Sequence, residues 1–392
     1  MGRLCTVRDV DWGQKTALVR VDFNVPMQDG RVADATRIRA ALPTLQYLRE
    51  HAARVVLLSH LGRPDGRPNP KFSLEPVAER LGELLKAPVP FAADCVGPIA
   101  ESAVKMIGAG EVVLLENVRF HPEEETNDTE FAKRLAALGD TFVNDAFGTA
   151  HRAHASTEGL AHLLPAVAGL LMEKEITVIA KALEDPRRPF VAIVGGAKVS
   201  SKLAVLQNLI DRVDCLLIGG GMANTFLRAA GYEVGRSLLE PDLVSTAKEL
   251  LAGGGKIILP KDVVVTTDLK SAEATVNTRA VEAVGPDEIV ADIGPRTVES
   301  FRSEIGQAGT VLWNGPMGVF ENSRFAEGTL AVARAMAESQ ATTIVGGGES
   351  VQSVEQAGLA DKLTHVSTGG GASLEFIEGK TLPGVAALRT DC

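Results

Sequence analysis

The sequence has 392 residues, 45% hydrophobic and 23% charged, which indicates a globular protein with two domains of ordinary size. A formal net charge of −10 argues against a nucleic-acid partner, and no apolar run approaches the roughly 20 residues that cross a membrane, so no membrane partner is predicted either. The cysteines are far apart and form no Cys-x-x-Cys pair, so we expect no zinc site and no disulfide framework, and four free thiols favour the cytoplasm.

Strands and helices alternate along the first half of the sequence. Short apolar runs predict strands at residues 16–21, 55–58, 112–115 and 141–143. Apolar residues with helical spacing predict helices at residues 35–48, 74–85 and 129–138. This alternation is typical of an α/β domain with a mainly parallel sheet.

Four arginines lie in or beside the loops after these strands, at Arg37, Arg63, Arg119 and Arg152. Because the ends of parallel strands share one edge of the sheet, we expect the guanidinium groups to converge there and to bind a carboxylate or phosphate of a small metabolite. The alternative is that each is an ordinary surface arginine. His60, His151 and His154 occupy the same loops, where a histidine more often forms hydrogen bonds than acts as a catalyst.

Motifs for nucleophilic catalysis are absent from the sequence, including Gly-x-Ser-x-Gly and any Ser-His-Asp spacing. A carboxylate acceptor would already be ionised near pH 7. Phosphoryl transfer to such an acceptor needs charge neutralisation and alignment rather than a general base.

Between the two halves, residues 169–180 read as a helix, and the charged segment 184–189 contains two prolines. The pattern predicts a strut between domains, followed by a linker. The alternation of strands and helices then continues, with strands predicted near 256–259, 289–293, 311–313, 343–345 and 363–367.

Apolar strands in the second half run repeatedly into glycines. The clearest case is residues 190–202, where Gly195-Gly196 precedes Lys198 and Lys202, and we expect both lysines to project from one face of the first helical turns. The same transition recurs at residues 216–221, 343–348 and 365–371. Four such turns at one sheet edge favour a phosphate-binding crevice. Any single turn could be only a tight connection, since the spacing is not that of a Walker A motif.

Five separate stretches carry a closer likeness, at residues 19–26, 59–64, 148–154, 195–199 and 313–316. In these stretches, and along nearly its whole length, the sequence resembles the phosphoglycerate kinase family. The resemblance implies two doubly wound α/β domains with mainly parallel sheets, which face each other across a cleft and are joined by a hinge helix. The domains would be residues 1–168, with the segment 383–392 packing back on them, and residues 169–382.

The same resemblance implies a cytoplasmic, monomeric enzyme of glycolysis and gluconeogenesis. Its reaction would be Mg²⁺-dependent phosphoryl transfer between 1,3-bisphosphoglycerate and ADP, giving 3-phosphoglycerate and ATP. The N-terminal domain would bind the phosphoglycerate through Asp22, Phe23, Asn24, Arg37, His60, Leu61, Gly62, Arg63, Arg119 and Arg152. The C-terminal domain would bind the nucleotide through Gly196, Lys198, Lys202, Asn314, Glu321, Gly347, Gly348, Glu349 and Ser350.

The resemblance to this family implies that three residues of the sequence take part in catalysis. Arg37 and Lys198 would stabilise the transferred phosphoryl group, and Gly370 would donate a backbone N–H to it. Glu349 is the expected metal ligand, although the family commonly has aspartate at this position. The extra methylene moves the carboxylate, so an intervening water could replace direct ligation.

Two alternatives stay open at this point. One is a small-molecule kinase that uses another carboxylate acceptor, and the other is a nucleotide-binding protein without catalytic activity. A coupled assay with 3-phosphoglycerate distinguishes the first, and any turnover of ATP excludes the second.

Overall fold

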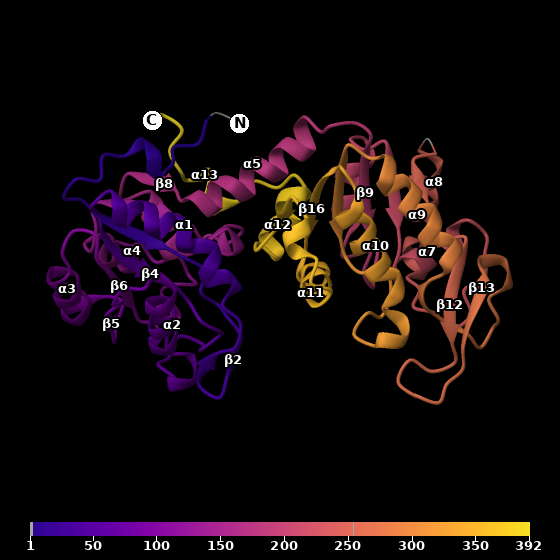
Figure 1. The fold of residues 1–392 in the computed structure, drawn as a ribbon, viewed down its shortest axis with the longest axis horizontal. Coiled ribbons are helices and arrows are strands. Elements are labelled where there is room, and N and C mark those ends of the chain that lie inside the picture. The colour runs from indigo at the N-terminus through magenta and orange to yellow at the C-terminus, as the bar shows by residue number, and fades with distance from the viewer. Residues whose placement is uncertain (1–2, 254) are drawn as a thin grey trace. The chain divides into compact units, whose positions relative to one another are not determined.

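The structure, a computed structural model, describes residues 3–253 and 255–392. The chain forms two compact units (Figure 1). The first unit comprises Met1–Thr177 together with Thr381–Cys392, and the second unit comprises Val178–Lys380. The chain passes from the first unit to the second within helix α5 (Leu170–Glu184) and returns between residues 380 and 381.

A six-stranded parallel sheet forms the middle of the first unit, in the order β5-β6-β4-β1-β7-β8. Its strands are β1 (Thr16–Arg20), β4 (Arg54–Leu58), β5 (Phe91–Ala92), β6 (Val112–Leu115), β7 (Thr141–Asn144) and β8 (Ala166–Ala168). Every residue of β1, β6 and β7 is buried, as expected for parallel strands covered on both faces. A small antiparallel hairpin, β2 (Met27–Gln28) and β3 (Arg31–Val32), follows β1.

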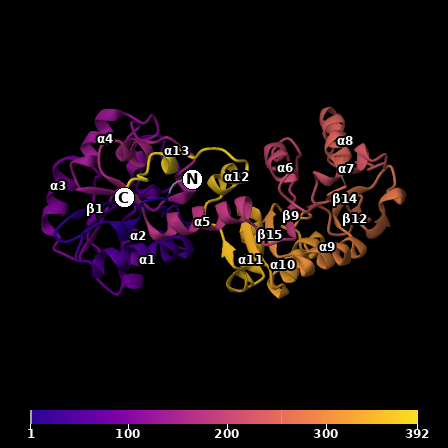
Figure 2. The same ribbon diagram turned by 90° about the horizontal axis from the view of Figure 1, so that it is seen from above.

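Helices cover both faces of this sheet (Figure 2). They are α1 (Thr36–Glu50), α2 (Glu75–Leu85), α3 (Gly97–Met106) and α4 (Thr129–Ala136). The connection from β1 to β4 runs across the sheet in one direction and that from β6 to β7 in the other. Right-handed crossovers therefore place α1 and α4 on opposite faces, which is the doubly wound arrangement predicted from the sequence.

The second unit repeats this plan with the strand order β11-β10-β9-β15-β16-β17. Its parallel strands are β9 (Phe190–Val194), β10 (Cys215–Ile218), β11 (Ile257–Ile258), β15 (Thr310–Asn314), β16 (Thr342–Gly346) and β17 (His365–Val366). Its helices are α6 (Leu203–Ile210), α7 (Ala223–Ala229), α8 (Val244–Ala252), α9 (Pro295–Gln307), α10 (Glu327–Glu338), α11 (Gly348–Gln356) and α12 (Gly371–Ile377).

A separate antiparallel sheet interrupts this alternation. It consists of β12 (Asp262–Thr266), β13 (Val276–Ala280) and β14 (Ile289–Ile293), in the order β13-β12-β14. The sequence predicted β14 as one more strand of the parallel sheet, and that placement was wrong. Val263 and Val265 on β12 are buried in their own small core with Leu227 and Val234, which a reading of apolar runs does not reveal.

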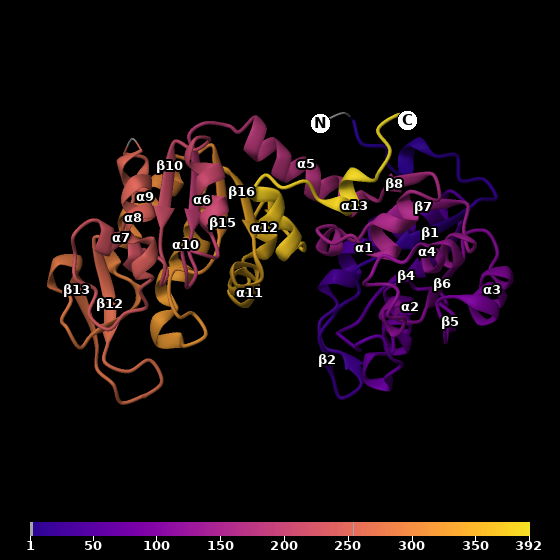
Figure 3. The ribbon, with the colours of Figure 1, turned by 180° about the vertical axis from the view of Figure 1, so that it is seen from behind.

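Residues 381–392, which we call the return segment, fold against the first unit. Helix α13 (Pro383–Ala386) belongs to this segment, which is bound to β8 through the hydrogen bond from the Arg389 N–H to the Ala166 carbonyl (Figure 3). Leu382, Val385 and Leu388 are buried. The Gly384 N–H donates to the Ala150 carbonyl at 2.9 Å, so the segment is held by both apolar and backbone contacts.

The expectation of four free thiols was wrong. Cys5 and Cys392 form a disulfide across a sequence separation of 387 residues, with Cα atoms 5.4 Å apart. Cys95 and Cys215 are free and buried. No sequence spacing could have indicated this pair, because folding brings together residues almost a chain length apart. Within the described residues, no helix combines the length and apolar character needed to span a bilayer.

Helix α9 begins at a buried carboxylate. Asp262 accepts hydrogen bonds from the Arg296 N–H at 3.0 Å and from the Thr297 N–H at 2.8 Å. Gly294 precedes the helix because a Cβ there would lie 2.4 Å from the Asp262 carboxyl carbon. Asp262 therefore satisfies N–H groups that the first turn of a helix cannot satisfy itself.

We expect Asp262→Ala to lower the free energy of unfolding of the second unit by about 2–3 kcal/mol, because it leaves buried N–H groups without an acceptor. Urea unfolding followed by the fluorescence of Trp313, in a Trp12→Phe background, reports on this unit alone. Asp287→Ala, at an exposed position, is the matched control. Equal midpoints for the two variants would contradict the assigned role.

Candidate functional site

Loops at the carboxyl ends of β1, β4, β6 and β7 hold the polar residues predicted for the first unit. Arg37, near the start of α1, donates to the Asp22 carboxylate at 2.9 Å and to the Asn24 carbonyl at 3.2 Å. The Asn24 side-chain oxygen accepts from the Gly62 N–H at 2.8 Å, and Arg119 donates to the Gly62 carbonyl at 3.0 Å. The loops after β1, β4 and β6 are thus bound to one another.

The other predicted residues differ in exposure. Arg63 is exposed in the loop after β4, and Arg152 is half-buried in the loop after β7. The side chains of Phe23 and Leu61 are buried in the core, so only their backbone atoms can face a ligand. Burial lowers the pKa of Arg119, and the charge of the nearby Arg152 lowers it further. The charge of Glu125 opposes both effects.

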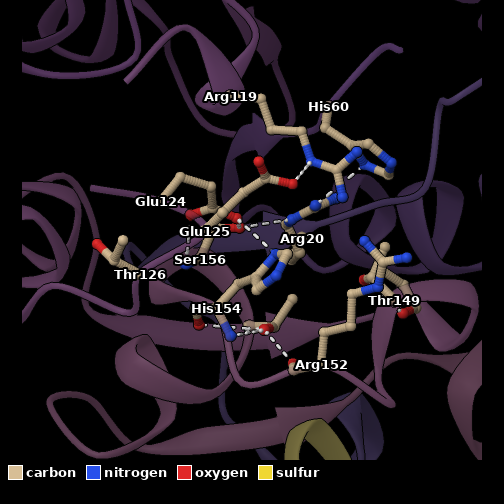
Figure 4. A network of polar contacts seen from close by, with 12 residues as sticks. Arg20, His60, Arg119, Glu124, Glu125, Thr126, Thr149, Arg152, His154 and Ser156 are labelled. Carbon is tan, nitrogen blue, oxygen red and sulfur yellow. Dashed lines mark hydrogen bonds and ion pairs between the residues drawn. The ribbon is translucent and has the colours of Figure 1, made fainter. Parts of the chain in front are cut away.

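Arg20, which the sequence analysis did not select, lies at the centre of this loop cluster (Figure 4). Its side chain is fully buried at the end of β1. It donates to the Ser156 hydroxyl at 2.8 Å and contacts His60 Nδ1 at 3.1 Å. The fully buried Glu124 accepts from the Ser156 hydroxyl at 2.6 Å and from the Ser156 N–H at 2.9 Å.

An arginine within an apolar strand was the sequence signal for this network. A buried guanidinium requires acceptors and a compensating charge, so its partners could have been sought among the loop residues. Glu124 stands in an acidic run with Glu123 and Glu125, a pattern typical of a solvated surface, yet its side chain is fully buried. Burial raises the pKa of Glu124, while Arg20 and Ser156 oppose that rise.

The contact with Arg20 fixes the tautomer of His60. A guanidinium can only donate, so His60 Nδ1 accepts and the ring proton sits on Nε2. Burial, and then Arg20, Arg119 and Arg37, hold the pKa of His60 well below its ordinary value of 6.5. His60 is therefore a neutral donor through Nε2 rather than a cation. For the same reasons, burial first and Arg119 next, the pKa of His154 is lowered to about 4.

The glycine turns of the second unit divide into two kinds. Gly195, Gly220 and Gly315 hold strand ends against one another, and a Cβ on Gly220 would lie 2.6 Å from backbone atoms of Gly196. At these three positions the glycine is required by a tight connection between strand ends, which is the alternative that the sequence left open. By contrast, a Cβ on Gly348 or Gly370 would meet nothing within 4 Å, so these positions leave the backbone open to a ligand.

A cavity of about 210 Å³ lies beside the turns at Gly196 and Gly220. Its walls are mostly apolar and include Leu238, Val290 and Val319, and Glu321 and Glu349 also line it. Asp292 also lines it, and burial raises the pKa of Asp292 to about 7. The cavity has the apolar lining and the few polar groups of a small-molecule site.

Lys202 and Asn314 connect the glycine turns. Lys202 donates to the Asn314 side-chain oxygen, and the Asn314 amide donates to the Gly346 carbonyl at 3.0 Å. Burial lowers the pKa of Lys202, which Glu349 and Glu378 oppose. The buried Ser350 hydroxyl accepts from the Gly315 N–H at 2.6 Å.

The expected position of the two lysines was wrong. Helix α6 begins only at Leu203, so Lys198 lies in the preceding turn and Lys202 in the residue before the helix. Lys198 is exposed, whereas Lys202 is half-buried. The two glycines and the following turn delay the helix, and apolar spacing alone does not locate a helix start to within a few residues.

Clustered guanidinium groups in one α/β unit, and glycine turns with lysines in another, are the arrangement of a kinase for a small anionic metabolite. The family model "Phosphoglycerate kinase" matches residues 7–380. The phosphoglycerate kinases of Chloroflexus aggregans and Moorella thermoacetica are 60% and 58% identical over 394 and 387 residues, with 98% of each chain covered.

Solved structures agree with this result. Phosphoglycerate kinase from Coxiella burnetii superposes with a TM-score of 0.90 at 44% identity, covering 98% of both chains. The enzyme from Pyrococcus horikoshii gives 0.86 at 36% identity, covering 99% of both chains. The chain belongs to the phosphoglycerate kinase family. It is therefore a phosphotransferase with a carboxyl group as acceptor, and it uses ATP or ADP together with a small-molecule substrate.

We expect His60 to remain neutral, with its proton on Nε2, at and below the ordinary imidazole pKa of 6.5. The unfolded chain takes up a proton near pH 6.5 while the folded chain does not, so the contribution of His60 to stability is complete above that pH and falls as the pH is lowered. Nitrogen-15 NMR of the imidazole measures both properties, with His60→Gln assigning the signals. An imidazolium at about pH 6, or a proton on Nδ1, would contradict this geometry.

Proposed function

We propose that the chain catalyses the reversible transfer of a phosphoryl group between 1,3-bisphosphoglycerate and ADP, giving 3-phosphoglycerate and ATP. The observation that carries the proposal is the cluster of buried and half-buried guanidinium groups in the first unit of a chain from this family. Two polyanions must be brought together in this reaction, and their repulsion is the main barrier that the protein has to offset.

The first unit is proposed to hold the phosphoglycerate. Arg63, Arg119 and Arg152 would bind the phosphate, because guanidinium groups match phosphate oxygens with paired donors. His60 would add a neutral N–H from Nε2, and Asp22 and Asn24 would accept from the substrate hydroxyl. Arg37 would lie at the carboxyl group that receives the phosphoryl group. Residues 61–62 would contribute backbone groups.

The second unit is proposed to hold the nucleotide. The apolar cavity fits a flat base, and Glu321, which lines it, would accept from ribose hydroxyls. Lys202 and Asn314, the open backbone at Gly348, and Gly196, Gly347, Glu349 and Ser350 would bind the phosphates. Lys198 would follow the transferred phosphoryl group, since an exposed lysine on a turn can move with its ligand.

We propose Mg²⁺ as the cofactor. Glu349 offers an exposed carboxylate beside the cavity and near Lys202, which is the hard oxygen ligand that Mg²⁺ prefers. The bound ion would neutralise phosphate charge. The glutamate side chain is longer than the family's usual aspartate, so we propose a water between the carboxylate and the metal.

The acceptor carboxylate is ionised near neutral pH, so the chain needs no general base. Arg37, Lys198 and the open N–H of Gly370 would stabilise charge on the phosphoryl group as it moves. Because the two reactants bind to different units, transfer requires a conformation in which both sets of groups reach one phosphoryl group.

The domain limits of residues 1–168 with 383–392, and of residues 169–382, remain part of this proposal. So do the monomeric state and the cytoplasmic location. An assay that couples 3-phosphoglycerate and ATP consumption to a second enzyme tests the function directly. ATP turnover with another carboxylate acceptor only would favour a different kinase, and nucleotide binding without turnover would favour a binding protein.

We expect Lys198→Ala to lower kcat on the order of a hundredfold and to change the KM for ATP little, because the lysine would act on the transition state more than on bound nucleotide. Steady-state kinetics of the purified variant measures both constants. Lys248→Ala, on an exposed face of α8, controls for the loss of one positive charge. An unchanged kcat in folded Lys198→Ala would remove Lys198 from the mechanism.

We expect Arg63→Ala to raise the KM for 3-phosphoglycerate at least tenfold and the KM for ATP less than twofold, on the order of one lost charge-assisted contact. Arg67→Ala is the matched control, since Arg67 is another exposed arginine in the same loop. The opposite order of effects would mean that the ligands are assigned to the wrong units.

A further inference from the structure

The Cys5–Cys392 disulfide lies at a junction of three chain segments. The Cys5 N–H donates to the Arg389 carbonyl at 2.9 Å, and the Cys5 carbonyl accepts from the Ala168 N–H at 2.9 Å. The Arg389 N–H donates to the Ala166 carbonyl at 3.1 Å. Backbone hydrogen bonds therefore join residue 5, β8 and the return segment independently of the sulfur atoms.

These contacts keep the two cysteines close even when they are not bonded. Leu382, Val385 and Leu388 stay buried against the first unit, and Gly384 bonds to Ala150. A disulfide between groups that the fold already holds together can open and close reversibly, because the effective concentration of one thiol near the other remains high.

The two sulfur atoms differ in access. Cys5 is only 2% exposed, whereas Cys392 is an exposed residue. Both line a cavity of about 370 Å³, which is large enough to admit a small thiol. Charged side chains also line this cavity, namely Asp9, Asp11, Lys15, Asp140 and Arg389. A reagent can thus reach the bond from the Cys392 side.

The other two cysteines offer a contrast within the same chain. Cys95 is completely buried, and burial raises its pKa well above the ordinary value. Burial also raises the pKa of Cys215 to about 12. Both thiols stay protonated near neutral pH and are poor partners in exchange. Only the pair at residues 5 and 392 combines proximity with access.

We propose that Cys392 is a site of thiol–disulfide exchange with small thiols and disulfides, and that the Cys5–Cys392 bond is a reversible clasp on the return segment. A small thiolate attacks Cys392 Sγ, the bond between the two cysteines breaks, and Cys5 leaves as a thiolate that takes a proton. A second small thiolate attacks the sulfur of the reagent in the mixed disulfide and releases the Cys392 thiolate. Two electrons pass from the two small thiols to the protein, and a small disulfide closes the clasp by the reverse steps.

The disulfide stabilises the protein mainly by restricting the conformations of the unfolded chain. Joining residues 387 positions apart removes conformational freedom from the unfolded state, and this effect grows with loop length. Since the hydrogen bonds and apolar contacts of the return segment remain after reduction, the folded site is preserved. We therefore expect reduction to lower the midpoint of thermal unfolding by about 5–10 °C and to change kcat at 25 °C less than about twofold.

Peptide mapping tests the bond itself. After incubation with oxidised glutathione and alkylation of free thiols, trypsin should release Leu4–Arg8 joined to Thr390–Cys392 as one species. Dithiothreitol should separate them and add the mass of two hydrogens to the intact chain. Linked peptides that never form under oxidising conditions would overturn the proposal.

Thermal unfolding with and without dithiothreitol tests the consequence. Cys392→Ser, a change at an exposed position, should unfold at the temperature of the reduced chain and should not respond to dithiothreitol. Cys215→Ser, which leaves the pair intact, should keep the full response. Identical midpoints for oxidised wild type and Cys392→Ser would overturn the role of the clasp, and a response retained by Cys392→Ser would assign the effect to another thiol.

Discussion

The loop cluster of the first unit depends on one buried charge. Arg20 is fully buried, and a guanidinium in that environment is stable only when its donors are satisfied and its charge is compensated. Ser156 and Glu124 meet both needs from one side, and His60 accepts from the other. The loops after β4, β6 and β7 are thereby bound at a single point to the end of β1, and the same loops carry Arg63, Arg119 and Arg152.

The second unit reaches its geometry by other means. Here the strand ends are joined through backbone groups, as when the Gly196 N–H donates to the Pro316 carbonyl and the Gly220 N–H to the Met317 carbonyl, both at 2.9 Å. Side chains would not fit between them. The unit that is proposed to bind the phosphoglycerate uses charged side chains, whereas the unit proposed to bind the nucleotide offers glycine backbone and two lysines.

The sequence was sufficient for the features that follow from local pattern. Alternating apolar runs predicted the parallel sheets, and the loop positions of Arg37 and Arg119 predicted that they would lie in one cluster. The sequence was insufficient for features that depend on contacts between residues far apart in the chain. The antiparallel sheet of β12–β14 depends on a separate small core, Arg20 reads as a strand residue until its partners are known, and nothing local connects Cys5 with Cys392.

The return segment also contacts the part of the first unit that carries Arg152. Asn144, at the end of β7, donates to the Gly384 carbonyl at 3.1 Å, and the Ala150 carbonyl accepts from the Gly384 N–H. Both residues flank or belong to the loop that carries Arg152. The point where the chain re-enters the first unit is therefore also bound to both ends of the segment that leads to Arg152 in the proposed phosphate site.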